Sequence, residues 1–60
     1  MNKYHIYRID ENGETQKRQT THAETITSAW AGSRGWYSDG TYLITNGDGS
    51  EAQLFILKRG

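Results

Sequence analysis

The side chains that acid–base catalysis would use in this chain are two histidines and seven carboxylates. Asp10 and Glu11 are adjacent, but they precede a turn and should point in different directions, whereas a catalytic acid and base must converge on one substrate. His5 falls on a strand beside aromatic residues, where we expect a packed or half-exposed imidazole. His22 falls in the first turn of an expected helix, which disfavours a positive charge. These groups predict no acid–base site.

The hydroxyl nucleophiles lack the neighbours that would activate them. No serine has a histidine at a motif spacing, and no Gly-x-Ser-x-Gly turn is present. Gly32-Ser33-Arg34-Gly35 is rich in glycine but does not match the phosphate-binding Walker pattern. So short a chain is also poorly suited to enclosing a pocket of a few hundred Å³. We therefore expect a protein that is not an enzyme.

One segment resembles a metal-binding loop. Asn46-Gly47-Asp48-Gly49-Ser50-Glu51 places oxygen-bearing side chains at alternate positions. It lacks the leading aspartate, the glycine at the sixth position and the distant glutamate of an EF-hand. Asn-Gly is by itself a strong signal for a hairpin turn, which the sequence favours here. The chain has no cysteine, so disulfides and thiolate zinc sites are excluded, and we expect no metal and no cofactor.

Basic and aromatic side chains suggest nucleic-acid binding as a second choice. Lys17 and Arg18 lie in a polar segment that Arg34 could join, and aromatic residues on a sheet can stack unpaired bases. A basic two-stranded ribbon could also enter a major groove. However, the seven basic residues are balanced by seven acidic ones, whereas nucleic-acid binding usually needs a basic excess. Charges on an edge strand also have an ordinary role in preventing aggregation.

The elements that must position these side chains are two hairpins and one helix. Asn-Gly turn signals sit between tyrosine-, threonine- and isoleucine-rich segments, which is typical of hairpins. Thr15 to Thr20 contains no apolar residue and predicts a polar edge strand. The expected strands are Lys3 to Asp10, Thr15 to Thr20, Thr41 to Thr45 and Glu51 to Lys58.

Between the hairpins, Thr21-His22-Ala23-Glu24 matches a capping box, which predicts a helix start. Ala23, Ile26 and Trp30 then share one helical face, with Ile26 and Trp30 as its anchors. Gly32 is placed to end the helix in the left-handed conformation. The sequence thus predicts one α+β domain over residues 1–60: a small ββαββ antiparallel sheet with one short helix packed on one face.

Apolar side chains are expected on both faces of this sheet, because strand side chains alternate between faces. One short helix of about 15 Å covers only one face. The other could be covered by a loop carrying Trp36 and Tyr37, by a second copy of the chain, or by another macromolecule. The alternating sets are Tyr4 and Ile6 against Tyr7 and Ile9, Tyr42 and Ile44 against Leu43, and Ala52, Leu54 and Ile56 against Phe55 and Leu57.

These features predict a small noncatalytic protein-binding domain that uses an aromatic sheet face or an edge strand. Homodimerisation is one way to bury such a face. Accessory and inhibitor proteins of this size are frequent in phages and mobile elements. No apolar run resembles a signal peptide or a membrane span, so we expect a cytoplasmic protein without a membrane partner. The candidate binding residues are Tyr7, Lys17, Arg18, Arg34, Trp36, Tyr37 and Phe55.

Overall fold

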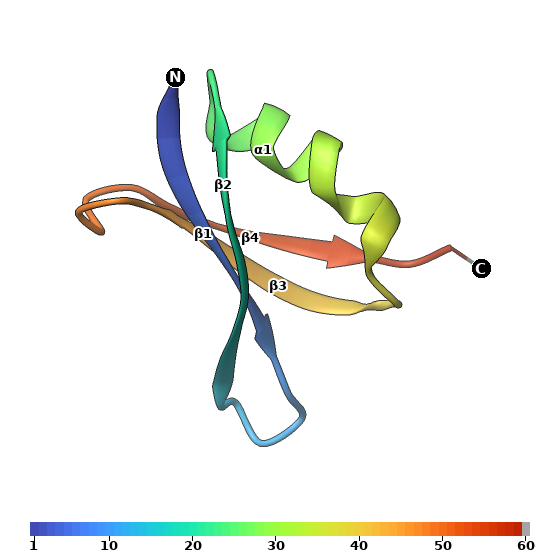
Figure 1. Ribbon diagram of the computed structural model, residues 1–60. Helices are drawn as coiled ribbons and strands as arrows, with labels where there is room; N and C mark the ends of the chain where they lie inside the picture. The colour runs from blue at the N-terminus through green and yellow to red at the C-terminus, as the bar shows by residue number, and fades with distance from the viewer. Residues whose placement is uncertain (60) are drawn as a thin grey trace.

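The computed structural model describes residues 1–59 as a four-stranded antiparallel sheet with a helix against one face (Figure 1). The expected α+β class and ββαββ order are confirmed. The strand order is β2-β1-β3-β4, so β1 and β3 are central and β2 and β4 form the edges. The elements are β1 (Asn2–Ile9), β2 (Thr15–Ala23), α1 (Ile26–Ser33), the short 3₁₀ helix η1 (Arg34–Trp36), β3 (Gly40–Asn46) and β4 (Ala52–Leu57).

Both expected hairpins are confirmed, and each turn contains a glycine with positive φ. Gly13 has a φ of 82° and Gly49 a φ of 78°, a region that glycine enters without a steric penalty. In the first turn, Asp10 Oδ1 accepts hydrogen bonds from the amides of Asn12 and Glu14, each at 2.9 Å. The Asp10 carboxylate therefore holds the turn of its own hairpin.

The helix begins later than its sequence signal indicates. Thr21 pairs with Tyr4 of β1, so β2 continues to Ala23 and the capping box predicted at Thr21 is wrong. Thr25 is the N-cap instead: its hydroxyl accepts the Ser28 amide at 3.1 Å, and Ser28 Oγ accepts the Thr25 amide at 3.0 Å. Pairing with β1 gives the Thr21 backbone partners that a helix start would not provide.

The helix also continues beyond Gly32, the residue expected to end it. Gly32 lies inside α1, and it is not among the glycines with positive φ. The chain continues through Ser33 into η1, with Arg34 in the right-handed helical region. The predicted glycine stop is therefore wrong, whereas the predicted anchors Ile26 and Trp30 are both buried.

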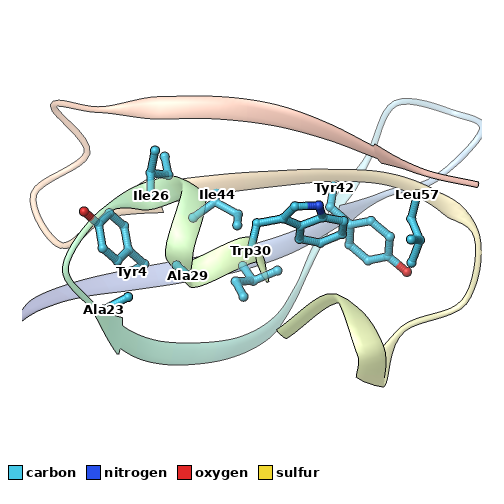
Figure 2. Packing of buried hydrophobic residues seen from close by; sticks show 9 residues of the cluster. Tyr4, Ala23, Ile26, Ala29, Trp30, Tyr42, Ile44 and Leu57 are labelled. Carbon is cyan, nitrogen blue, oxygen red and sulfur yellow. The ribbon is translucent and has the colours of Figure 1, made fainter. Parts of the chain in front are cut away.

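The core lies between α1 and one face of the sheet, with Trp30 at its centre. The Trp30 ring centroid is 5.2 Å from that of Tyr42 and 5.1 Å from that of Phe55. Aromatic pairs at such separations add to the stability gained from burial alone. The buried cluster consists of Tyr4, Ile6, Ala23, Ile26, Ala29, Trp30, Tyr42, Ile44 and Leu57 (Figure 2).

Trp36 and Tyr37, which follow α1, lie in different environments. Tyr37 stacks on Tyr42 with ring centroids 5.1 Å apart, so it joins the core on the helix side. Trp36 is 82% exposed in η1. The loop that carries Trp36 and Tyr37 therefore does not cover the second face of the sheet. A second copy of the chain and another macromolecule are the remaining candidates for covering it.

Arg8 secures the start of β3. Its guanidinium donates to the Tyr42 hydroxyl at 2.6 Å, to Ser38 Oγ at 3.2 Å and to the Asp39 carbonyl at 3.0 Å. Gly40 leaves the space for it, since a Cβ there would come within 2.7 Å of the guanidinium. Arg8 thus joins β1 to the loop that leads out of the helix.

The stacked tyrosines should respond differently to loss of the hydroxyl. The Tyr42 hydroxyl donates to the Ser38 carbonyl at 2.7 Å and accepts from Arg8, whereas the buried Tyr37 hydroxyl has no hydrogen-bond partner among residues 1–59. Tyr42→Phe should lower the free energy of unfolding by about 1–3 kcal/mol, because it removes two hydrogen bonds, one of them from a charged guanidinium. Tyr37→Phe should leave it unchanged or raise it. Urea denaturation followed by circular dichroism compares the two, and a larger loss for Tyr37→Phe would contradict this arrangement.

Candidate functional site: the open face of the sheet

The face of the sheet turned away from α1 is the candidate site, and we call it the open face. Because strand side chains alternate, the odd-numbered residues of β1 and their register partners on the other strands share this face. Its members are Lys3, His5, Tyr7 and Ile9 of β1, Thr15, Lys17, Thr20 and His22 of β2, Thr41, Leu43 and Thr45 of β3, and Ala52, Leu54 and Ile56 of β4.

The β4 side of the open face is apolar and exposed. Leu54 is 59% exposed and Ile56 is 77% exposed. Leu54, Leu43 and Tyr7 lie in one row across three strands, and Ile56 and Ile9 lie in the next row. We call these five residues the apolar strip. Leu43, Tyr7 and Ile9 are partly buried, and Thr41 lies between Ile56 and Ile9. Exposed apolar side chains that adjoin one another on a small protein are typical of an interaction surface.

The β2 side of the open face is basic. Lys3 pairs with His22, and Lys17 pairs with Tyr7, at the border of the apolar strip. The chain's carboxylates lie in turns and loops outside the four strands, at Asp10, Glu11, Glu14, Glu24, Asp39, Asp48 and Glu51. The open face therefore carries positive charge although the chain as a whole is neutral.

The pKa of His5 responds to the positive charge of the open face. Its Nδ1 and the Thr20 hydroxyl are hydrogen-bonded at 2.9 Å. Partial burial lowers the pKa of His5, and the positive charges of Lys17 and Lys3 lower it further. The imidazole therefore favours its neutral form in the folded chain.

An NMR titration should give His5 a pKa below the usual value of 6.5, and Lys17→Gln should raise that pKa. Because the pKa is lower in the folded chain, the unfolded chain binds this proton more readily. Acidification through and below about pH 6.5 should therefore weaken folding, and the loss is complete below the folded-state pKa. Lys58→Gln is the matched control, since Lys58 follows β4, which β3 separates from the strand that carries His5. An unchanged His5 pKa in Lys17→Gln would contradict the shared location.

The loop that resembled a calcium site uses its oxygen atoms to hold its own turn. Asn46 Oδ1 accepts the Glu51 amide at 3.0 Å, and Asp48 Oδ1 accepts the Ser50 amide at 2.9 Å. Hydrogen bonds from the Ser50 side chain and backbone lower the pKa of Asp48. Within residues 1–59, no cluster of three or more histidine or carboxylate side chains is placed to hold a metal ion. This geometry agrees with a hairpin turn.

The structure brings two of the sequence-predicted binding residues together. Tyr7 and Lys17 are register partners on the open face. Leu43 and Leu54 extend the same row but were not among the candidates. Alternation along β3 and β4 sets Leu43 and Leu54 apart from their sequence neighbours, but it does not show which set faces α1.

The remaining candidates lie elsewhere. Tyr37 and Phe55 pack against the core on the helix side. Arg18 is the extra residue at the register shift in β2. Burial raises the pKa of Tyr37 and the charge of Arg18 opposes that rise, so Arg18 acts on the helix side. Arg34 and Trp36 are exposed in η1.

No protein-family model, curated protein or solved structure matches this chain. None of the helices described is long and apolar enough to cross a membrane. Function is therefore inferred from the open face.

Proposed function

We propose that this chain is a small noncatalytic protein-binding domain and that the open face is its binding surface. The exposure of Leu54 and Ile56, 59% and 77%, carries the proposal. Both belong to a strip that continues through Leu43 to Tyr7 and Ile9, on the face that α1 leaves uncovered. Covering this strip would remove exposed apolar surface from water, which is the main favourable contribution in most protein association.

The chemistry of the open face specifies the partner. The apolar strip requires apolar side chains opposite it. Lys17 beside the strip and Lys3 farther along β1 favour carboxylates on the partner. Charges at the border of an interface mainly set orientation and association rate, while the buried apolar contacts supply most of the affinity. We therefore expect a protein surface in which apolar residues are flanked by acidic ones.

The homodimer predicted from the sequence stays a proposal. A second copy would have to bind other than face to face, because its open face carries the same positive charge. An accessory or inhibitor role would follow if the open face covers a surface that its partner needs for activity. The inhibitor role, the phage-like origin and the cytoplasmic location expected from the sequence stay predictions.

The charge of the open face favours one alternative, binding of single-stranded nucleic acid. Tyr7 and His5 could stack bases, and Lys3 and Lys17 could neutralise phosphates. Such a ligand would leave Ile56 and its apolar surroundings exposed to water. Protein binding is the better account because it uses both halves of the face.

Site-specific photo-crosslinking tests the proposal. A benzoylphenylalanine replaces Tyr7, which lies in the open face on a central strand, and a matched control carries the same group at Thr27, exposed on α1. Irradiation in the source cells should give protein adducts at position 7, resistant to nuclease, and few at position 27. Adducts removed by nuclease would favour the alternative. Equal yields at the two positions, or no adduct at position 7, would overturn the proposal.

A further inference from the structure

The two edges of the sheet are built differently. The β2 edge carries Lys17 and Arg18 and has a register shift, and charges and irregularities of this kind prevent another strand from pairing. β4 reads Ala-Gln-Leu-Phe-Ile-Leu, without a charge or a proline, and it keeps one register with β3 along all six residues. A regular apolar edge without such protection is a template for a further strand.

The outer side of β4 presents backbone groups for such a strand. Residues facing each other in an antiparallel pair alternate between exchanging hydrogen bonds and exchanging none. The Asn46 amide donates to the Glu51 carbonyl at 3.1 Å. Continuing this alternation, Gln53, Phe55 and Leu57 bond to β3. The N–H and C=O groups of Ala52, Leu54 and Ile56 therefore point away from the sheet.

Opposite charges lie at the two ends of β4. Glu51 precedes the strand, and Lys58 and Arg59 follow it. Two copies of β4 in antiparallel orientation place Glu51 of each near the basic end of the other. A parallel arrangement would instead bring like charges together. The strand is therefore electrostatically complementary to itself in one orientation only.

We propose that two copies of this chain pair antiparallel through β4 and form one continuous sheet with four strands from each copy. A two-fold axis perpendicular to the sheet relates the copies, which is the symmetry of most homodimers. This axis keeps both open faces on the same side. The inference rests on the proposed function in that it names a second copy as a partner, and it joins the two apolar strips into one surface.

The symmetry also restricts the register. Residues opposite each other must share a face, so the axis passes through a residue position. Overlap along most of the six-residue strand then places the axis at Leu54 or at Phe55, the two residues at its middle. With the axis at Phe55, Leu54 of each copy lies opposite Ile56 of the other, and Glu51 lies opposite Arg59. This register covers the two most exposed apolar side chains of the strand with each other, and it is the one proposed.

Sedimentation of the whole chain tests the pairing. The wild type should have twice the 6.8 kDa mass of one chain and should dissociate on dilution. Ile56→Lys should stay folded by circular dichroism, since Ile56 is 77% exposed, but should have the mass of one chain. Thr27→Lys adds the same charge on α1 and should remain dimeric. A wild type that is monomeric throughout the dilution series, or an Ile56→Lys variant that stays dimeric, would overturn the proposal.

Disulfide formation tests the register, and the chain has no cysteine of its own to interfere. An equimolar mixture of Leu54→Cys and Ile56→Cys should give mainly the mixed disulfide, because facing residues lie within disulfide range. A preference for products that link identical variants would overturn the proposed register. A monomeric wild type that still gives adducts to a different protein at position 7 would reject this inference and leave the proposed function standing.

Discussion

Trp30→Ala is expected to leave the chain unfolded at room temperature. Trp30 is buried and packs against Tyr42, Phe55 and Tyr37, so its removal empties the centre of the only described core. Truncation of a buried tryptophan to alanine costs about 3–5 kcal/mol. The core of a domain this small supplies about 3–5 kcal/mol in all. The loss therefore equals the whole free energy of unfolding.

Trp36→Ala is the matched control because it removes the same side chain from an exposed position in η1. Trp36 is 82% exposed, and substitutions at such positions change stability by about 0.5 kcal/mol or less. Circular dichroism and the dispersion of amide signals in a proton–nitrogen NMR spectrum measure both variants. A folded Trp30→Ala variant, or an unfolded Trp36→Ala variant, would show that the core is assigned to the wrong tryptophan.

The hairpins and the anchoring role of Trp30 could be predicted because their signals are local. Asn12-Gly13 and Asn46-Gly47 each announce a chain reversal within a few residues, and both reversals are present. Trp30 shares a helical face with Ile26 whether the helix begins at Thr21 or at Thr25. The predictions of the hairpins and of Trp30 as an anchor therefore hold even though the boundary between β2 and α1 was misplaced.

The start of the helix could not be predicted in the same way, because a distant segment decides it. Thr21 satisfies a capping-box pattern through Glu24, but its backbone pairs with Tyr4 at the other end of the hairpin. The competing box of Thr25 and Ser28 lacks the usual glutamate or glutamine and is weaker as a pattern. Only the length of the β1–β2 pairing shows which threonine caps the helix.

The identity of the open face was also beyond the sequence. Alternation separates Phe55 from Leu54 and Ile56, but it does not say which set α1 covers when both are apolar. Phe55 meets Trp30 and is therefore part of the core side. The neighbouring Leu54 and Ile56 are left outside, which moves the candidate site from Phe55 to its neighbours along the strand.

The zero net charge does not reveal that the open face is basic, because net charge is a sum over the whole chain. The carboxylates lie in turns and loops, while Lys3 and Lys17 point from β1 and β2 to the open face. A neutral chain thus presents a locally basic surface. Neutrality of the whole chain is therefore weak evidence against nucleic-acid binding, and the exposed apolar strip is the observation that supports the proposal of protein binding.

Ile44→Ala should lower the free energy of unfolding by about 2–5 kcal/mol, the usual range for a buried isoleucine. Ile44 is fully buried at 0% exposure, opposite Ile6 on the core side of the sheet. Ile56→Ala makes the same chemical change on the neighbouring strand, at 77% exposure on the open face. In a single copy it should cost about 0.5 kcal/mol or less. Urea denaturation at a protein concentration low enough to keep the chain monomeric compares them directly.

Raising the protein concentration extends this comparison to association. If β4 pairs with a second copy, the wild type gains stability by mass action as concentration rises, and Ile44→Ala should keep that gain. Ile56→Ala should lose much of it, because its side chain faces Leu54 of the second copy. Equal losses for the two isoleucines in the monomer would mean that one copy already covers Ile56. Such a result would contradict both the open face and the β4 pairing, since each depends on Ile56 being exposed to solvent in a single copy of the chain.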